Sequence, residues 1–399
     1  MLLSFALMVK NEKEHLDRCL KSVQPFNAEI VVLDTGSTDE TVDIAKKFTD
    51  QVFHQKWQDN FSLHRNKSFS LANGDWIFQI DADEEIVFED ERAPHVFLEY
   101  IKQLPPEITA VGFPLRDFRP STNTYAAEFD VARCFRRGTV TYNRKIHNRP
   151  DFSGSIVYFD ALYLRHYGYD LTEEQRKVKA QRTIRLLLES IAEDPSDSES
   201  YFYLCQSYKQ LNEDNSKSIE YGLKYLDMME GIPPANFNQA IFHTMAALYF
   251  EEGDLVNSGQ MIKRGLANND KSPDLWFDTL KIAVKEKNMK AIANASQHYV
   301  VAIKDLRKTR TTTNLGGQFF FYTDSDSVAT GLYYLSMCYL QNGVSEMINL
   351  KKILSFCSPV TRQQIVERMK QDMEIMGLQD LNQETLPSAD MAAMAFAGK

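Results

Sequence analysis

The stretch Trp76-Ile77-Phe78-Gln79-Ile80-Asp81-Ala82-Asp83 decides which fold the sequence predicts for the first part of the chain. Its first five residues are almost wholly apolar, which is typical of a strand buried on both faces of a sheet. Asp81 and Asp83 follow at the carboxyl end of that strand. Carboxylates two residues apart on a strand point to the same side, so these two can share one divalent cation. A solvated turn is the alternative for such a triplet, and the preceding apolar strand counts against it.

Strands and helices alternate on both sides of this stretch. Further strands are expected at Leu3–Val9, Glu29–Leu33 and Val52–His54, with apolar residues at helical spacing between them. Ser37 and Glu40 have the spacing of a capping box at the start of one such helix. This alternation predicts a parallel, doubly wound, Rossmann-like α/β sheet. Such sheets bind ligands at the carboxyl ends of their strands, so polar residues at those ends are candidate site residues.

After Tyr169 the strand signals fade and helical spacing dominates. One segment matches the helix–turn–helix spacing of the tetratricopeptide repeat, the opening of the same pattern recurs at Tyr201 and Leu332, and a weaker copy begins at Phe277. The matching residues are Phe242, Met245, Ala246, Tyr249, Gly253, Ser258, Ile262 and Gly265. We therefore expect an α/β domain over residues 1–170, an all-α repeat domain over 171–375 and a flexible tail over 376–399. The insertion between Thr309 and Ser327 is long enough to be functional.

The composition excludes several classes of function. The 399 residues include 45 basic and 55 acidic side chains and carry a net charge of −10, which disfavours binding to a nucleic-acid polymer. No apolar run reaches the roughly 18 to 20 residues of a membrane-spanning helix. The five cysteines are scattered and lack metal spacing, which is typical of reduced thiols and predicts a cytoplasmic protein.

Several other residues have both a functional and an ordinary structural interpretation. Asp34 ends the second strand and is placed for a ribose or base edge, or merely caps a turn. Arg65 is suited to phosphate or to solvent. His147 and His166 could contact a metal or phosphate, or be structural. One stretch of the sequence is basic although the chain as a whole is acidic. It is either a pocket for pyrophosphate or an acidic acceptor, or a solvated face. It comprises Arg133, Arg136, Arg137, Arg144, Lys145 and Arg149.

Taken together, these motifs resemble a family-2 glycosyltransferase domain of the GT-A fold, which binds nucleotide sugars. The motifs are Val9-Lys10-Asn11-Glu12, Asp34–Asp39, Arg65-Asn66, Asp81-Ala82-Asp83-Glu84, Arg133-Cys134-Phe135-Arg136, Lys145-Ile146-His147 and His166-Tyr167-Gly168-Tyr169. The resemblance covers about the first 170 residues. It is to a bacterial branch in which some members carry tetratricopeptide repeats, including the S-glycosyltransferases of glycocin peptides.

The resemblance implies an inverting transfer from a nucleotide diphosphate sugar, most often a UDP-sugar, to an acceptor such as a peptide or protein. It implies Mn²⁺ or Mg²⁺ bound by Asp83, with His166 and His147 as further metal ligands. In the same way it implies that Asp34 and Glu12 hold the nucleoside and that Asp81 contacts ribose or sugar. The full set implied for the nucleotide is Val9, Asn11, Glu12, Asp34, Arg65, Asp81, Ala82, Arg133 and Arg136.

One position departs from the family pattern and affects the general base. The branch usually has Glu directly after the His of its later motif, whereas this chain has Asn148, which cannot accept a proton as a base. Glu128 and Asp130, on the expected strand before the basic stretch, are therefore the candidate bases, with Asp117 behind them.

Three other functions stay open at this point. The acceptor could be an envelope or lipid-linked saccharide instead of a peptide. A sugar nucleotidyltransferase has a similar sheet, but its Gly-rich loop near the first strand is missing here. The chain could also be a non-catalytic scaffold with a degenerate transferase domain, against which the intact Asp81 and Asp83 argue. The repeats themselves could bind the acceptor in a concave groove or form a homodimer interface.

Overall fold

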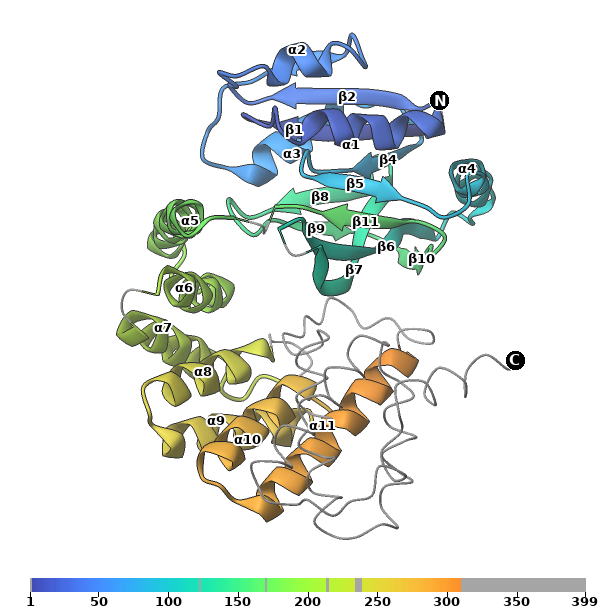
Figure 1. Ribbon diagram of the computed structural model, residues 1–399. Helices are drawn as coiled ribbons and strands as arrows, with labels where there is room; N and C mark the ends of the chain where they lie inside the picture. The colour runs from blue at the N-terminus through green and yellow to red at the C-terminus, as the bar shows by residue number, and fades with distance from the viewer. Residues whose placement is uncertain (1, 122, 169–170, 213–214, 234–238, 310–399) are drawn as a thin grey trace, which may run out of the picture. The chain divides into compact units, whose positions relative to one another are not determined.

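The computed structural model describes residues 2–309 apart from 122, 169–170, 213–214 and 234–238 (Figure 1). Two compact units divide this part of the chain, the first ending at Ile232 and the second beginning at Pro233. The expected repeat copy at Leu332, most of the insertion after Thr309 and the tail 376–399 lie outside the described residues. The first unit thus extends beyond the α/β domain expected over residues 1–170.

Four parallel strands form the first half of the main sheet. They are β1 (Leu3–Val9), β2 (Glu29–Asp34), β3 (Val52–His54) and β4 (Trp76–Gln79), in the spatial order β3-β2-β1-β4. Val9 and Asp34 are register partners at the ends of β1 and β2. The parallel arrangement predicted from strand–helix alternation is confirmed for these strands, and their carboxyl ends share one edge.

The second half of the sheet is mixed rather than parallel. Long strand β7 (Thr124–Arg136) runs antiparallel to both β4 and β6 (Ile108–Arg119). Beyond β6 lie β11 (Tyr163–His166), parallel to it, and β5 (Glu84–Val87), antiparallel to β11, while β10 (Ser155–Tyr158) pairs separately with β6. The expectation of a wholly parallel sheet was wrong here because the β6–β7 hairpin inserts an antiparallel strand beside β4. A separate ribbon joins β8 (Val140–Asn143) and β9 (Arg149–Phe152).

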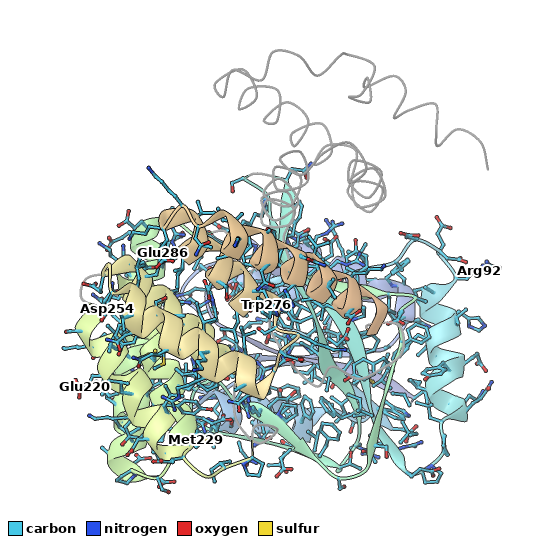
Figure 2. The ribbon with its side chains drawn as sticks, turned by 90° about the horizontal axis from the view of Figure 1, so that it is seen from below. Arg92, Glu220, Met229, Asp254, Trp276 and Glu286 are labelled. Carbon is cyan, nitrogen blue, oxygen red and sulfur yellow. The ribbon has the colours of Figure 1, made fainter. Side chains whose placement is uncertain are left out.

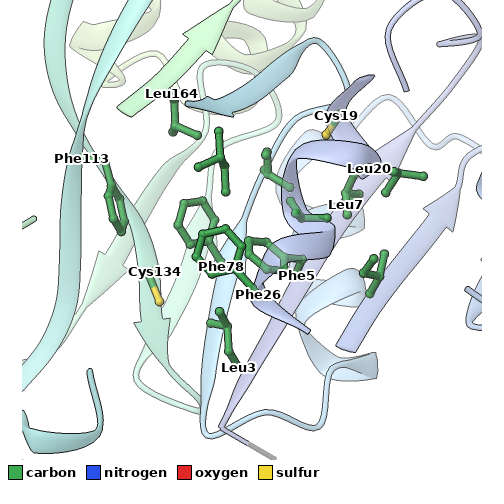
Figure 3. Close-up of a cluster of buried hydrophobic side chains, with 14 of the residues drawn as sticks. Leu3, Phe5, Leu7, Cys19, Leu20, Phe26, Phe78, Phe113, Cys134 and Leu164 are labelled. Atoms are coloured by element: carbon green, nitrogen blue, oxygen red, sulfur yellow. The ribbon is translucent and has the colours of Figure 1, made fainter. Parts of the chain in front are cut away.

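Helices cover both faces of the sheet, because each inner strand is apolar on both sides. On one face, alternate residues Leu3, Phe5 and Leu7 of β1 pack with Phe26 and Phe78, as Figure 3 shows. The helices α1 (Leu16–Val23) and α4 (Ala93–Gln103) and the single helical turn η1 (Gln24–Phe26) contribute to this core. On the opposite face, α3 (Phe61–Leu71) contributes Phe69 to a second cluster, which contains Ala6 of β1 and Ile77 of β4.

The predicted capping box did not form. Helix α2 begins only at Thr41 and ends at Ala45, and its first residue is preceded by Glu40 without a side-chain cap. The Ser37 hydroxyl instead accepts a hydrogen bond from the backbone N–H of Asn11 (2.9 Å). Ser37 therefore joins the loops after β1 and β2, which is a tertiary role that local spacing does not reveal.

Three helices complete the first unit after the sheet. They are α5 (Glu173–Glu193), α6 (Ser198–Leu211) and α7 (Asn215–Met228). Thr172 begins α5 with a capping box, in which its side chain accepts from the Gln175 N–H and Gln175 accepts from the Thr172 N–H. Leu186 and Leu187 of α5 are fully buried together with Leu204 of α6. Helices α5 and α6 therefore pack against each other through an apolar seam.

The described part of the second unit consists of helices α8 (Ala240–Glu251), α9 (Leu255–Asn268), α10 (Pro273–Lys285) and α11 (Met289–Thr309). Asp254, labelled in Figure 2, caps α9 by accepting from the Asn257 N–H (3.0 Å). A Cβ on Gly265 would lie 2.8 Å from Cβ of Phe242, so glycine permits the close approach of α8 and α9. This is the helix pair that the repeat spacing predicts.

Candidate functional site

Acidic residues gather where the parallel strands end. Glu12 follows β1, Asp34 ends β2, and Asp81 and Asp83 follow β4. The last residues of β4 are buried, as are Ile80 and Ala82 after it. Because β2, β1 and β4 are adjacent and parallel, these carboxylates lie along one edge of the sheet. The placement of Asp81 and Asp83 after a fully buried strand agrees with the expectation from the sequence.

Asp81 is held by two arginines. Its carboxylate accepts from Arg65 (Nη2 to Oδ1, 3.0 Å) and lies 3.5 Å from Nη2 of Arg133. Burial raises the pKa of Asp81, but the charges of Arg65 and Arg133 outweigh it and keep the pKa below its usual value. Asp81 is consequently ionised and held in one orientation. Arg65 is buried beside it, so the alternative of a solvated arginine on a polar helix face does not hold.

Glu84 is a site residue to which the sequence motif gave no role. Its carboxylate is almost fully buried and is ion-paired with Arg133, which also donates to Gln79. It further accepts from the Asp81 backbone N–H (3.0 Å). Burial raises the pKa of Glu84 and the charge of Arg133 opposes that rise. Glu84 therefore fixes both the Asp81 turn and the Arg133 guanidinium, which is a supporting role rather than a ligand-binding one.

A second chain of contacts runs from Asp83 through His166 to Asp117. His166 Nε2 lies 3.3 Å from Oδ2 of Asp83, and its Nδ1 lies 2.7 Å from Oδ1 of Asp117. Desolvation lowers the pKa of His166, but hydrogen bonds to Asp117 and Asp83 outweigh it and raise that pKa to about 10. Asp117, a reserve candidate for the base, is thus the buried partner that orients His166.

Gly168 leaves space beside this pair. A Cβ at residue 168 would lie 2.1 Å from Oδ2 of Asp83 and 2.6 Å from Nε2 of His166, so no other residue fits without moving them. Among the described residues no group of three or more His, Cys, Asp or Glu is arranged to hold a metal ion. Asp83 provides a carboxylate of the kind that binds Mg²⁺, a cation that takes one or two protein carboxylates and completes its shell with phosphate and water.

Glu12 lies within the electrostatic reach of this acidic group. Desolvation, together with the charges of Asp83 and Asp81, raises the pKa of Glu12 to about 8. Its position is fixed from the backbone, because the Glu12 N–H donates to Oγ1 of Thr41 (2.7 Å). The preceding Asn11 has a φ of 55° and accepts from the Thr38 N–H (2.8 Å). Glu12 therefore lies close enough to Asp83 and Asp81 for their charges to act on it.

Asp34 shapes the turn at the end of β2. It accepts from the backbone N–H groups of Gly36 (3.2 Å) and Ser37 (3.1 Å), and His54 Nδ1 lies 3.2 Å away. Burial raises the pKa of Asp34, and these hydrogen bonds outweigh it and lower the pKa. Asp34 therefore caps the turn, which is one of the two roles that the sequence left open for it. Its ionised carboxylate lies at the edge of the sheet where the parallel strands end.

The basic stretch splits between two places. Arg136, opposite Trp76 at the start of β4, donates to the carbonyl oxygens of Leu104 (2.7 Å) and Ile108 (2.8 Å). This position is at the opposite end of β4 from Asp81. The structure therefore does not bring Arg136 together with Arg133 and Asp81, although the two arginines are separated by only three positions in sequence.

The later basic residues pair with acidic residues around the α5–α6 turn. Arg144 donates to both carboxylate oxygens of Asp197 (2.7 and 2.9 Å), Arg149 lies 2.6 Å from Glu199, and Lys145 is paired with Glu193. His147 stacks on Tyr203 of α6, with ring centroids 3.7 Å apart. His147 is thus placed against α6 rather than beside Asp83, and the sign reversal noted in the sequence is neutralised by acids that come later in the chain.

The two candidate bases, Glu128 and Asp130, lie on β7, the strand that pairs with β6 and its residue Asp117. The register pairs Glu128 with Arg116, Ala127 with Asp117, and Asp130 with Pro114. The charge of Asp130 contributes, after burial, to a raised pKa of Tyr158 on β10. Glu128 directly follows Ala127, which is the register partner of Asp117. Both candidate bases therefore lie in the same β6–β7 hairpin as Asp117.

Comparison with known proteins shows which proteins this part of the chain is similar to. Residues 4–168 match the family described as Glycosyl transferase family 2. A TPR repeat-containing protein of Synechococcus elongatus is 31% identical over 266 residues, which are 63% of this chain and 62% of the relative. The SPbeta prophage-derived glycosyltransferase SunS of Bacillus subtilis is 31% identical over 229 residues, 54% of this chain and 51% of the relative.

The chain thus spans between about half and 62% of the length of these two curated relatives. Among solved structures, S. aureus TarS 1–349 aligns with a TM-score of 0.31 and 11% identity, over 81% of this chain and 100% of that chain. No helix in the described part of the chain has the length and apolar character needed to cross a membrane. The match begins within β1 and covers the other strands of the main sheet together with Glu12, Asp34, Asp81 and Asp83, so residues 4–168 are the segment of this chain that is similar to a family 2 glycosyltransferase domain.

Proposed function

We propose that this chain transfers a sugar from a nucleotide diphosphate donor, with UDP-sugar as the first candidate, to an acceptor hydroxyl or thiol with inversion at the anomeric carbon. The pair Asp81 and Asp83 at the carboxyl end of β4, in a family 2 domain, is the observation that carries this proposal. A departing diphosphate needs fixed positive charge and a cation, and both kinds of partner are arranged around this pair.

The donor nucleoside is assigned to the ends of β1 and β2. The backbone at Val9, the fixed loop at Asn11 and the carboxylates of Glu12 and Asp34 would contact base and ribose there. Asp81 and the adjacent backbone of Ala82 would contact ribose or donor sugar. The contact between Asp81 and Arg65 supports this assignment, because it fixes the carboxylate in one orientation before any ligand arrives.

Asp83 and His166 would hold the divalent cation, Mn²⁺ or Mg²⁺. When bound, such a cation supplies charge neutralisation for the diphosphate leaving group. Asp117 would keep His166 in the orientation that presents Nε2 toward Asp83, as carboxylates do for many metal-binding histidines. His166 must lose the proton that Asp83 and Asp117 now stabilise in order to become a ligand, so binding of the cation would release a proton.

The general base is proposed on β7. A carboxylate across from the leaving diphosphate would remove the acceptor proton as the new bond to the anomeric carbon forms. Glu128 and Asp130 remain the two candidates, because the role of Asp117 as the partner of His166 leaves it committed. A thiol acceptor would need a weaker base than a hydroxyl, since its pKa is lower.

A peptide or protein is the proposed acceptor. Paired helices from α8 to α11 with the small residues Ser258 and Gly265 at their contacts support a repeat array, and such arrays present extended binding surfaces. The same array could instead join two copies of the chain. Light scattering on the full chain, with and without acceptor peptide, separates a monomer that binds peptide from a homodimer.

A thermal-shift screen of nucleotide sugars with Mn²⁺ tests the proposal. One UDP-sugar should stabilise the wild-type chain, and Asp83→Asn should remove the Mn²⁺-dependent part of that shift. Asp90→Asn is the matched control, because Asp90 is an exposed carboxylate whose ion pair in the described part of the chain is with nearby Arg92. Absence of stabilisation and of donor hydrolysis with every nucleotide sugar would reject a transferase and favour a scaffold.

A further inference from the structure

Helix α5 lies outside the matched segment 4–168 and carries basic residues at a spacing of three. Lys179 and Arg182 are one turn apart on α5, and Arg185 follows after another turn. Residues three apart on a helix lie on neighbouring parts of the same surface. Arg185 is ion-paired with Asp59 (2.9 Å), immediately before α3, which directs this surface of α5 toward the sheet domain.

The position of α5 is fixed by packing as well as by charge. Ile184 and Leu187 of α5 form an apolar cluster with Ile146, against which Phe61 of α3 packs. The Arg182 guanidinium lies 5.7 Å from the ring centroid of the same Phe61. At the far end of the helix, the Arg144–Asp197 and Lys145–Glu193 pairs connect the α5–α6 turn to the β8–β9 ribbon. Contacts along the middle of α5 and at its carboxyl end thus hold the helix in one place.

The charges along this helix surface match the acidic residues of the site. Desolvation lowers the pKa of Lys179, while the carboxylates of Asp83 and Asp117 oppose that shift by favouring the charged amine. Glu12 interacts with both cations, because its charge acts on Lys179 and also on Arg182. Lys179 therefore lies within charge-interaction range of the residues that would hold the cation and the nucleoside.

We infer that α5 completes the donor site, with Lys179 and Arg182 as the side chains that bind the diphosphate of the donor. This inference rests on the proposed function. The diphosphate gains a third negative charge as its bond to the sugar breaks, which is more than one divalent cation neutralises, and the arginines already at the site are paired, Arg65 with Asp81 and Arg133 with Glu84. The remaining charge of the diphosphate needs further cations, and α5 supplies them.

The inference also assigns a role to the basic residues that lie around the α5–α6 turn. Arg144, Lys145 and Arg149 bind the acids of the α5–α6 turn. They act as positioning residues for α5, and through α5 for the phosphate-binding cations. The basic stretch therefore contributes to donor binding indirectly, by holding the helix that carries Lys179 and Arg182.

Binding of UDP and of uridine to the full chain, measured by isothermal titration calorimetry with Mn²⁺, tests this inference. Lys179→Gln and Arg182→Gln should each weaken UDP binding about tenfold, as expected for loss of one charge-assisted contact. Uridine lacks the diphosphate, so its affinity should stay unchanged. Lys179→Arg should restore most of the UDP affinity. Lys177→Gln, which removes a cation paired with Glu173 on the same helix, is the matched control and should bind both ligands as wild type does.

The outcomes separate failure of the inference from failure of the proposed function. Wild-type chain that binds neither UDP nor uridine rejects the proposed donor. Wild-type chain that binds UDP normally, with Lys179→Gln and Arg182→Gln unchanged, rejects only the role of α5. Equal losses of UDP and uridine binding would also reject it, because they would reflect a displaced helix instead of a lost phosphate contact.

Discussion

Replacement of Gly168 by alanine is expected to separate Asp83 from His166 with little effect on the rest of the sheet domain. Ordinary contact with a Cβ begins at 3.4 Å, whereas the new methyl would lie 2.1 Å from Oδ2 of Asp83 and 2.6 Å from Nε2 of His166. The two donor atoms must therefore retreat by about 1.3 and 0.8 Å. Both atoms are the proposed cation ligands, so the substitution acts directly on the cation site.

The expected loss follows from these displacements. Disturbed orientation of metal ligands typically costs roughly 10- to 100-fold in metal affinity, and we expect the UDP affinity in the presence of Mn²⁺ to fall by a similar factor. Overpacking of a well-packed site costs about 1–3 kcal/mol of folding free energy. Calorimetric titration with and without Mn²⁺ measures the binding effect, and urea denaturation measures the stability.

Gly259→Ala is the matched control for this substitution. Gly259 lies in α9, and a Cβ there would meet nothing within 4 Å, so alanine should leave UDP binding unchanged and stabilise the helix slightly. If folded Gly168→Ala binds UDP with Mn²⁺ within about threefold of wild type, then the space beside Asp83 and His166 is not a cation site.

Three further predictions concern other parts of the first unit. His166 has a pKa raised to about 10 in the folded chain, so its stabilising contribution should be complete below about pH 6.5 and lost as the pH rises toward 10; urea denaturation across this range should show the loss, and Asp117→Asn should flatten it. Arg144→Ala should lower the free energy of unfolding by about 1–3 kcal/mol, because its partly buried acidic partner loses two hydrogen bonds; an unchanged denaturation midpoint would contradict the positioning role. Whichever of Glu128→Gln and Asp130→Asn removes the base should lower kcat about 10²- to 10⁴-fold without changing UDP affinity, and normal turnover in both variants would place the base elsewhere.

The parts of the fold that follow local periodicity could be predicted from the sequence. The buried Trp76 strand, its two following carboxylates and the α8–α9 pair each depend on residues close together in the chain. The mixed half of the sheet could not be predicted in this way, because strand direction in the β6–β7 hairpin depends on pairing with β4 rather than on residue pattern.

The candidate site shows the same division. Asp81 and Asp83 are adjacent in sequence, whereas the partner of His166 comes from a different strand and could only be proposed as a base. The basic stretch has a sign of charge that suits phosphate, but its partners lie in the α5–α6 turn, and sequence does not show which charges meet. Ion pairing between distant segments is set by the tertiary structure, which is why these residues were interpreted as ligand-binding ones.

The ion pairs between the β8–β9 ribbon and the α5–α6 turn have a consequence for chimeric enzymes. A junction at the end of the matched family segment, near residue 168, would detach α5 from Arg144, Lys145 and Arg149 and leave those cations without their acidic partners. The compact unit instead ends at Ile232, after α7. Exchange of the helical second unit between relatives is therefore best designed with the crossover at this later position, so that the grafted portion begins at α8 and the native ion pairs stay within one parent.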